Sequence, residues 1–207
     1  MAVQYRVGLA TISKLVPKVC KLLWETLQPV VMKMLQSTED WEKIATDFMM
    51  QWNYPHCVGH VDGKHIVVRS QKNSSSLFHS SKGTFHIVMM ALVDASCKFI
   101  CVDIGSYGRQ SNAGVFSNSN LGEALMPPND LNLPRDAPIL GAKYLGKLPY
   151  VIVGDEAFPL QTHLIRPYPG QLCTEFQQAF NYRHSRARRI SRVCFWHACS
   201  KMASFRQ

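Results

Sequence analysis

Three strand-like segments in direct succession, followed much later by a fourth, constrain the fold of this 207-residue chain more than any other feature. Apolar runs occupy residues 57–69, 84–94 and 97–104, and a fourth occupies residues 149–155. The second run, TFHIVMMALVD, is apolar enough to be a central strand. The tight Ala95-Ser96 connection predicts that the second and third strands form a hairpin.

Helical patterns surround these strands. Between residues 7 and 35 apolar side chains recur at helical spacing, and Pro17 and Pro29 divide this stretch into short helices. Ser37 and Asp40 form a capping-box-like start for a helix that runs to about Trp52. Residues 173–205 predict a last helix, broken near Asn181.

This order of elements predicts the fold class. Residues near 115–126, between the third and fourth strands, are weakly helical. Three consecutive strands, a helical crossover, a fourth strand and a final helix are the order of a ribonuclease-H-like α/β fold. We therefore expect a mixed sheet flanked by helices and preceded by a small helical region. Residues 1–55 would form that helical region, part of it helix-turn-helix-like, and residues 56–207 the ribonuclease-H-like domain.

The charge of the chain indicates a polyanionic partner. The net charge is +9 and the pI is near 9.3, which favours nucleic acid over a membrane. No acidic residue follows Glu175. A solvated helix face normally carries both positive and negative charges, so we interpret this wholly basic C-terminal segment as a phosphate-binding surface. Its basic residues are Arg183, Arg186, Arg188, Arg189, Arg192, Lys201 and Arg206. No apolar run approaches the ~20 residues of a membrane span, so we expect no membrane partner.

The cysteines and histidines favour no zinc site. Seven cysteines, an odd number without a regular framework, indicate free thiols in a reducing compartment. We therefore expect the nucleus, with the cytoplasm as the alternative. His56, His60 and His65 surround Asp62, but their spacing matches no closed zinc site, so we interpret them as loop or core histidines.

Two aspartates carry the chemical signal. Asp62 and Asp155 each stand at the end of a buried strand-like run. Carboxylates at the tips of adjacent strands can hold a hard divalent cation, and two such ions can clamp the attacking and leaving oxygens of a phosphodiester displacement. Each aspartate has a plainer interpretation: Asp62-Gly63 could be a turn between strands, and Asp155 could cap a loop.

Six segments together give the chain a family resemblance. They are WNYPHCVGHVDGKHI (52–66), KGTFHIVMMALVDA (82–95), VDIGSYGRQSN (102–112), VGDEAFPL (153–160), RPYPG (166–170) and FNYRHSRARR (180–189). In this order, and over nearly the whole chain, they resemble the DDE-type endonuclease domain of PIF/Harbinger transposases and their domesticated relatives.

The resemblance implies roles for individual residues. Asp62 and Asp155 match the two catalytic, metal-binding aspartates, with Mg²⁺ or Mn²⁺ as the cofactor. Asn112 stands where many relatives have an acidic residue, and its amide oxygen can still coordinate a metal. Arg192 stands at the position of the third carboxylate, 37 residues after Asp155, and a guanidinium cannot ligate a cation. Glu175 could replace that carboxylate only if a break near Asn181 folded the helix back.

The function implied is divalent-metal-dependent DNA endonuclease chemistry, by hydrolysis or strand transfer, impaired by Arg192. Arg183, Arg186, Arg188, Arg189 and Arg192 would bind DNA, and a separate DNA-binding protein could supply sequence choice. One alternative is a catalytically inactive, transposase-derived DNA-binding or protein-interaction domain. Another is an unstable product of a decaying gene copy. Against the family pattern we also expect the domain to be C-terminally truncated.

Overall fold

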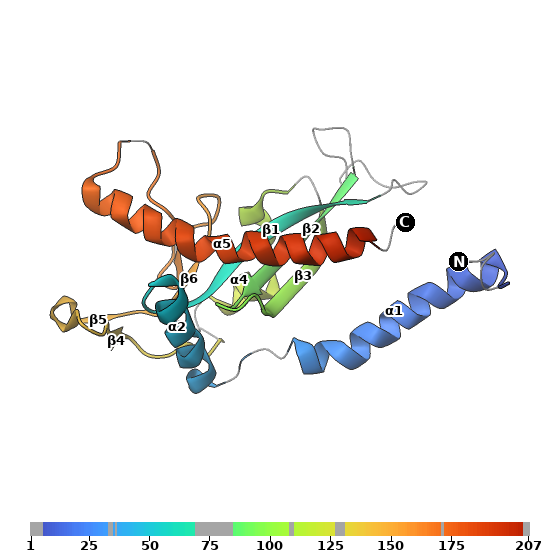
Figure 1. The fold of residues 1–207 in the computed structure, drawn as a ribbon, viewed down its shortest axis with the longest axis horizontal. Helices are drawn as coiled ribbons and strands as arrows, with labels where there is room; N and C mark the ends of the chain where they lie inside the picture. The colour runs from blue at the N-terminus through green and yellow to red at the C-terminus, as the bar shows by residue number, and fades with distance from the viewer. Residues whose placement is uncertain are drawn as a thin grey trace. The chain divides into compact units, whose positions relative to one another are not determined.

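A computed structural model of the chain describes residues 6–32, 35, 37–68, 85–107, 110–126, 131–170 and 172–204 (Figure 1). In the last helix it describes the backbone throughout and the side chains of residues 175–189, 194 and 195. The chain divides into two compact units, Met1–Met34 and Leu35–Gln207.

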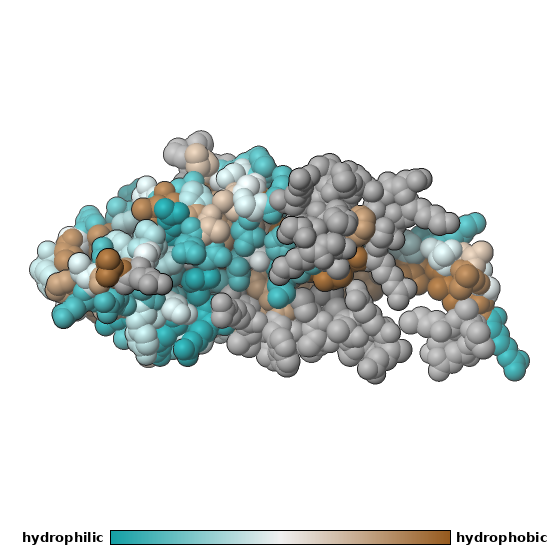
Figure 2. Space-filling model, turned by 90° about the horizontal axis from the view of Figure 1, so that it is seen from above, coloured by the Kyte–Doolittle hydropathy of each residue, from teal (hydrophilic) through white to brown (hydrophobic). Residues whose placement is uncertain are grey.

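Among its described residues, 6–32, the first unit contains one helix, α1 (Leu9–Val31). The prediction of several short helices was wrong, because Pro17 and Pro29 both lie inside α1. No residue of α1 is buried, so water can solvate the carbonyl groups that the prolines leave without an N–H partner. Apolar side chains of α1, including Leu22 and Trp24, are exposed. Brown, hydrophobic surface is visible on this helix in Figure 2. None of the helices in the described ranges is long and apolar enough to cross a membrane.

The second unit is built on a five-stranded mixed sheet of strand order β3-β2-β1-β6-β7. Its strands are β1 (Cys57–Val68), β2 (Phe85–Val93), β3 (Phe99–Tyr107), β6 (Val151–Val153) and β7 (Leu164–Ile165). The neighbours β1, β2 and β3 pair antiparallel, whereas β6 runs parallel to β1 and β7 parallel to β6. A separate two-stranded ribbon pairs β4 (Ala137–Pro138) with β5 (Lys147–Leu148) around a short 3₁₀ turn, η2 (Lys143–Leu145).

In the described part of this unit the sheet is accompanied by the helices α2 (Thr38–Trp52), α3 (Asn112–Ser117), α4 (Asn120–Ala124) and α5 (Glu175–Ser204). The predicted cap of α2 is confirmed, since the Asp40 amide donates to Ser37 Oγ at 3.2 Å. α2 packs against β1 and buries Trp41, whose indole N–H donates to the Leu131 carbonyl at 2.8 Å. A mixed sheet flanked by helices, with a helical N-terminal region, confirms the predicted class and is consistent with a ribonuclease-H-like fold.

Helix α5 crosses one face of the sheet (Figure 1). Phe195 on α5 packs with Met89 and Ala91 of β2. The predicted break near Asn181 is wrong, because α5 is continuous from Glu175 to Ser204. The Asn181 side chain accepts from the Tyr168 amide at 2.8 Å and donates to the Tyr168 carbonyl at 3.1 Å. Since its polar atoms bond to this loop, they do not compete with the hydrogen bonds of the helix backbone.

A disulfide joins α5 to the turn between β2 and β3. It links Cys97 and Cys194, 97 residues apart in sequence, with their Cα atoms 5.3 Å apart. The prediction of free thiols was therefore wrong for this pair, because cysteines distant in sequence give no local signal of pairing. Four other cysteines of the described part are free: Cys20, Cys57, Cys101 and Cys173.

Candidate functional site

Asp62 lies inside strand β1. The strand runs without interruption through Asp62 and Gly63, which pair with Ala91 and Met90 of β2. The interpretation of Asp62-Gly63 as a turn is therefore excluded, and so is the expectation that Asp62 ends its strand. Residues of β1 up to Val61 are buried, and from Asp62 onward they are half-buried or exposed. Asp62 thus marks the point at which β1 leaves the core.

Asp155 reaches the same level of the sheet from the neighbouring parallel strand. His60 of β1 is in register with Val153 of β6, and each aspartate follows two residues later. Adjacent strands are about 4.8 Å apart, so this register brings the two aspartates close together. Both side chains are half-buried.

The aspartates lie on the sheet face that α5 covers. Residues directly opposite each other on paired strands point to the same face, so Asp62 points with Ala91 toward the Phe195 side of α5. From the same helix, Arg188 Nη2 lies 3.8 Å from Asp155 Oδ2. About a quarter of each of these two side chains is exposed, so water partly screens the ion pair.

Backbone amides orient both carboxylates. The Gly63 amide donates to Asp62 Oδ1 at 2.9 Å, and the Ala157 amide donates to Asp155 Oδ1 at 2.9 Å. Asp155 therefore does cap a turn, as its plainer interpretation held. The cap engages one oxygen and does not exclude metal binding by the carboxylate.

Asn112, the first residue of α3, contacts β1 at Gly63. A methyl group at Gly63 would overlap Asn112 Oδ1 and lie 2.7 Å from its Cγ. This Oδ1 is buried and has no hydrogen-bond partner. Because successive strand residues point to opposite faces, Asn112 approaches β1 from the face opposite to the Asp62 side chain. The structure thus places Asn112 against Gly63, the residue that follows Asp62, and on the opposite side of the sheet from the Asp62 carboxylate.

The residues at this place fit a divalent cation in part. Two half-buried carboxylates at one level offer the oxygen ligands that Mg²⁺ and Mn²⁺ prefer. Among the side chains that the structure describes, no group of three or more His, Cys, Asp or Glu residues could hold a metal ion. Arg188 also places a positive charge beside Asp155. Such a donor set fits a weakly held cation.

The arginines of α5 fall into two groups. Arg183 and Arg189 are exposed and Arg186 is half-buried; these three follow one another at intervals of three residues. Arg188 is half-buried and turned toward Asp155. Position 192 lies one helical turn beyond Arg188, and the Arg192 side chain is outside the described part.

Glu175 does not reach the third carboxylate position. It is exposed at the first residue of α5. Because the helix is continuous, 17 residues separate Glu175 from position 192, which is about 25 Å along the axis. The folding-back that a substitute carboxylate would require does not occur.

Buried polar side chains beside the site gave little signal in the sequence. His60 is fully buried on β1, and neither ring nitrogen has a hydrogen-bond partner. Burial lowers the pKa of His60 well below its usual value, and the nearby Arg188 and His184 add to this effect. His184 of α5 is also fully buried, and His56 lies apart from it, stacked on Tyr150.

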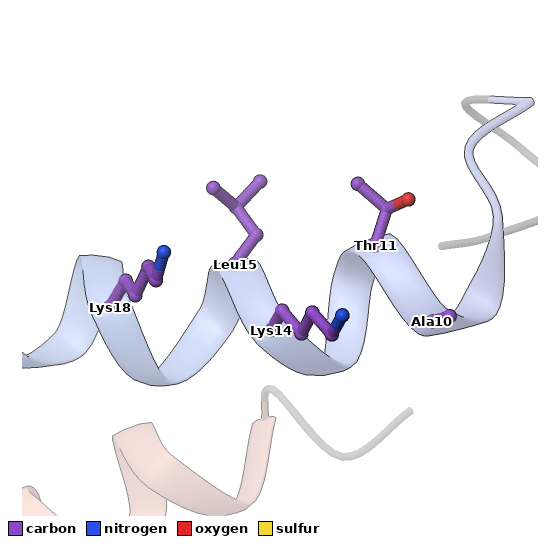
Figure 3. Close-up of a pocket in the computed structure, with 5 residues that line it drawn as sticks. All are labelled: Ala10, Thr11, Lys14, Leu15 and Lys18. Atoms are coloured by element: carbon purple, nitrogen blue, oxygen red, sulfur yellow. The ribbon is translucent and has the colours of Figure 1, made fainter.

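Surface depressions also occur along α1. One of them is lined by Ala10, Thr11, Lys14, Leu15 and Lys18, successive turns of a single helix (Figure 3). It contains no carboxylate and no nucleophilic cysteine, so it offers no competing catalytic site.

Comparison with known proteins identifies the family. The model of the DDE superfamily endonuclease family matches residues 61–198, which include both aspartates and position 192. This chain belongs to the DDE superfamily endonucleases. The chain is also similar to Protein ALP1-like of Arabidopsis thaliana, with 28% identity over 154 residues. The matched region covers 73% of this chain and 37% of that relative. No solved structure matches the chain.

Family membership confirms the resemblance found in the sequence and supports a transposase-derived nuclease domain. DDE endonucleases generally use divalent metals, and a nuclease domain of this family implies interaction with DNA.

Proposed function

We propose that this chain is a Harbinger transposase-derived, divalent-metal-binding DDE-type endonuclease domain whose cleavage of DNA phosphodiesters is impaired. One observation carries the proposal: Asp62 of β1 and Asp155, two residues beyond the end of the parallel strand β6, lie at the same level of the sheet, on the face that α5 covers. Two carboxylates converging there are the first two members of a three-carboxylate metal site.

Asp62 and Asp155 would hold Mg²⁺ or Mn²⁺. When bound, such an ion polarises a phosphoryl oxygen and lowers the pKa of an attacking water. The Gly63 and Ala157 amides keep one oxygen of each carboxylate in a fixed direction, which reduces the entropy lost on binding. The Asn112 amide packs against Gly63 on the opposite face of the sheet, so in this position it does not complete the ligand set on the α5 side.

The exposed side of α5 would bind the DNA backbone. Arg183, Arg186 and Arg189 succeed one another along the helix, and arginine pairs well with phosphate. Phosphate contacts of this kind carry affinity and little sequence information. We therefore propose that a separate DNA-binding protein supplies sequence choice, and that the protein acts in the nucleus.

Impairment follows from charge. A carboxylate at position 192 would add a third negative ligand, whereas Arg192 adds a positive charge. Together with Arg188 beside Asp155, it would weaken cation binding. The same observation favours the second candidate function, a catalytically inactive DNA-binding or protein-interaction domain.

A cleavage assay separates the two candidates. Purified chain is incubated with labelled duplex DNA and Mn²⁺, beside Asp155→Ala, Arg192→Glu and, as a matched control, Glu156→Ala, which removes an exposed neighbouring carboxylate. We expect weak nicking that is lost in Asp155→Ala, kept in Glu156→Ala and increased in Arg192→Glu. Nicking seen in Arg192→Glu alone would establish the inactive domain. No Mn²⁺ binding by any of the four proteins would refute the metal site.

DNA binding is tested independently of cleavage. Fluorescence anisotropy with duplex DNA should give an affinity that falls steeply between about 50 and 200 mM salt. Arg183→Gln and Arg189→Gln should each weaken binding and reduce the salt slope by about 1. Arg135→Gln, an exposed arginine outside α5, serves as the control. Equal effects of all three variants would contradict a binding surface on α5.

A further inference from the structure

A buried hydrogen-bonded chain connects α2, α5 and the residue before Asp155. His184 of α5 is fully buried, and its Nε2 lies 2.7 Å from the carbonyl oxygen of Gly154. Its other ring nitrogen, Nδ1, lies 3.3 Å from the hydroxyl of Tyr54, which follows α2 and is also buried. Gly154 immediately precedes Asp155, so α5 is bonded to the backbone that carries this carboxylate.

The partners fix the tautomer of His184. A carbonyl oxygen only accepts, so Nε2 carries the proton and donates to Gly154. Nδ1 is then the acceptor, and the Tyr54 hydroxyl donates to it. The Phe180 ring stacks on His184 with centroids 5.5 Å apart, which limits rotation of the imidazole. Burial lowers the pKa of His184 to about 4, so the ring is neutral at physiological pH, as this arrangement requires.

Gly154 has little freedom to move away from His184. Its amide donates to the Ile165 carbonyl of β7 at 2.9 Å. A methyl group at Gly154 would lie 3.0 Å from the Phe158 ring, so the loop packs closely over this residue. One helical turn after His184, Arg188 pairs with the Asp155 carboxylate itself. Helix α5 therefore holds both the backbone and the side chain of this short segment.

We propose that His184, held by Gly154 and Tyr54 in a single tautomer, is a positioning residue that keeps the Asp155 carboxylate in its orientation beside Asp62. The catalytic meaning of this positioning rests on the proposed function, whereas the mechanical coupling does not. The plainer interpretation is a buried histidine that contributes only to global stability.

The chain contains a matched control for that interpretation. His163 Nδ1 lies 2.9 Å from the carbonyl oxygen of Tyr150, so it makes the same kind of bond at the other end of β6. His163 is half-buried and lies far along the strand from Asp155. Its loss removes an equivalent histidine–carbonyl bond without touching the proposed coupling.

Amide hydrogen exchange tests the coupling without metal or DNA. The reporters are the amides of Ala157 and Phe158, which donate to Asp155 Oδ1 and to the Asp155 carbonyl. We expect His184→Leu to speed their exchange about tenfold relative to amides in the centre of β2. His163→Leu should leave them unchanged, and His184→Gln, which restores a donor, should recover much of the protection.

Two outcomes would overturn the proposal. One is equal acceleration of the reporters and of the β2 amides, which is the signature of global destabilisation. The other is the same effect from His163→Leu. If His184→Leu does not fold, Tyr54→Phe decides. It keeps the Gly154 bond, removes the hydroxyl that donates to Nδ1 and so loosens the imidazole, and it should speed reporter exchange about threefold. No change would refute the role of the Tyr54–His184–Gly154 chain in holding Asp155.

Mn²⁺ titration links the coupling to the proposed function. Apparent affinity should fall about tenfold in His184→Leu and stay unchanged in His163→Leu. A native chain that binds no Mn²⁺ but shows the expected exchange pattern refutes the metal site and leaves the coupling intact. Normal Mn²⁺ binding with unchanged reporter exchange in His184→Leu refutes the coupling alone.

Discussion

Replacement of Gly63 by alanine tests how closely α3 packs against the strand that carries Asp62. Gly63 has no positive φ, so alanine suits its backbone. The new methyl group would overlap Asn112 Oδ1 and lie 2.7 Å from Cγ and 3.1 Å from Nδ2. An ordinary carbon–carbon contact is about 3.5–4.0 Å, so the Asn112 amide must move by about 1 Å.

The expected magnitude follows from two opposing effects. Overpacking of this kind costs about 1–3 kcal/mol. Replacing glycine by alanine restricts the unfolded chain and returns about 0.4–1 kcal/mol. Gly63→Ala should therefore lower the free energy of unfolding by about 1–2 kcal/mol, or the Tm by about 2–8 °C for a unit of this size. In an Asn112→Ala background the obstacle is gone, and Gly63→Ala should stabilise the protein by about 0.5 kcal/mol.

Urea denaturation of the four proteins of this double-mutant cycle measures the effect. We expect a coupling energy of about 1.5–2.5 kcal/mol between the two positions. Gly114→Ala is the control within α3, because its methyl group would meet only Ser111 Oγ at an ordinary 3.5 Å. A coupling energy below about 0.5 kcal/mol would refute the contact between α3 and β1.

Three further predictions concern stability. Because the folded pKa of His184 lies near 4 and the unfolded value near 6.5, the unfolded chain binds the proton first. The free energy of unfolding should therefore be highest above pH 6.5 and should fall by up to about 3 kcal/mol as the pH is lowered to 4. This fall should be smaller in His184→Gln, and identical profiles of unfolding free energy against pH for the two proteins would contradict the prediction. Reduction of the Cys97–Cys194 disulfide should lower the free energy of unfolding of the native protein by about 2–4 kcal/mol. The same reductant should leave the stability of Cys194→Ser unchanged, and a loss of stability in that variant would show that another bond is being reduced. Asn181→Ala should cost about 1–2 kcal/mol and speed proteolysis near Tyr168, since two hydrogen bonds are lost; unchanged cleavage there would show that they do not hold this loop.

The disulfide also bears on the expected location of the protein. Disulfides are rare in nuclear and cytosolic proteins, where thiols are kept reduced. In a reducing nucleus Cys97 and Cys194 would be thiols, packed beside Val93 at the junction of α5 and the hairpin. Free thiols counted in protein isolated from nuclei, and in the same protein after oxidation, would show whether Cys97 and Cys194 are thiols or a disulfide in the cell.

The sequence by itself determined the local elements and their order. The apolar runs fixed three successive strands, and the Ser37 cap fixed the start of α2, because such patterns act over a few neighbouring residues. The same local patterns, read beside family motifs, singled out Asp62 and Asp155. Local reasoning was wrong where a distant partner intervened: Asn181 bonds to Tyr168 and leaves α5 unbroken.

Only the tertiary structure decided how these elements meet. The register of β1 with β6 brings Asp155 level with Asp62, although 93 residues separate them. The same packing turns Arg188 toward Asp155 and bonds His184 to Gly154. No periodicity or spacing encodes such contacts, because they depend on where α5 lies across the sheet. The sequence therefore supplied the two carboxylates, and the fold supplied the helix that orients one of them.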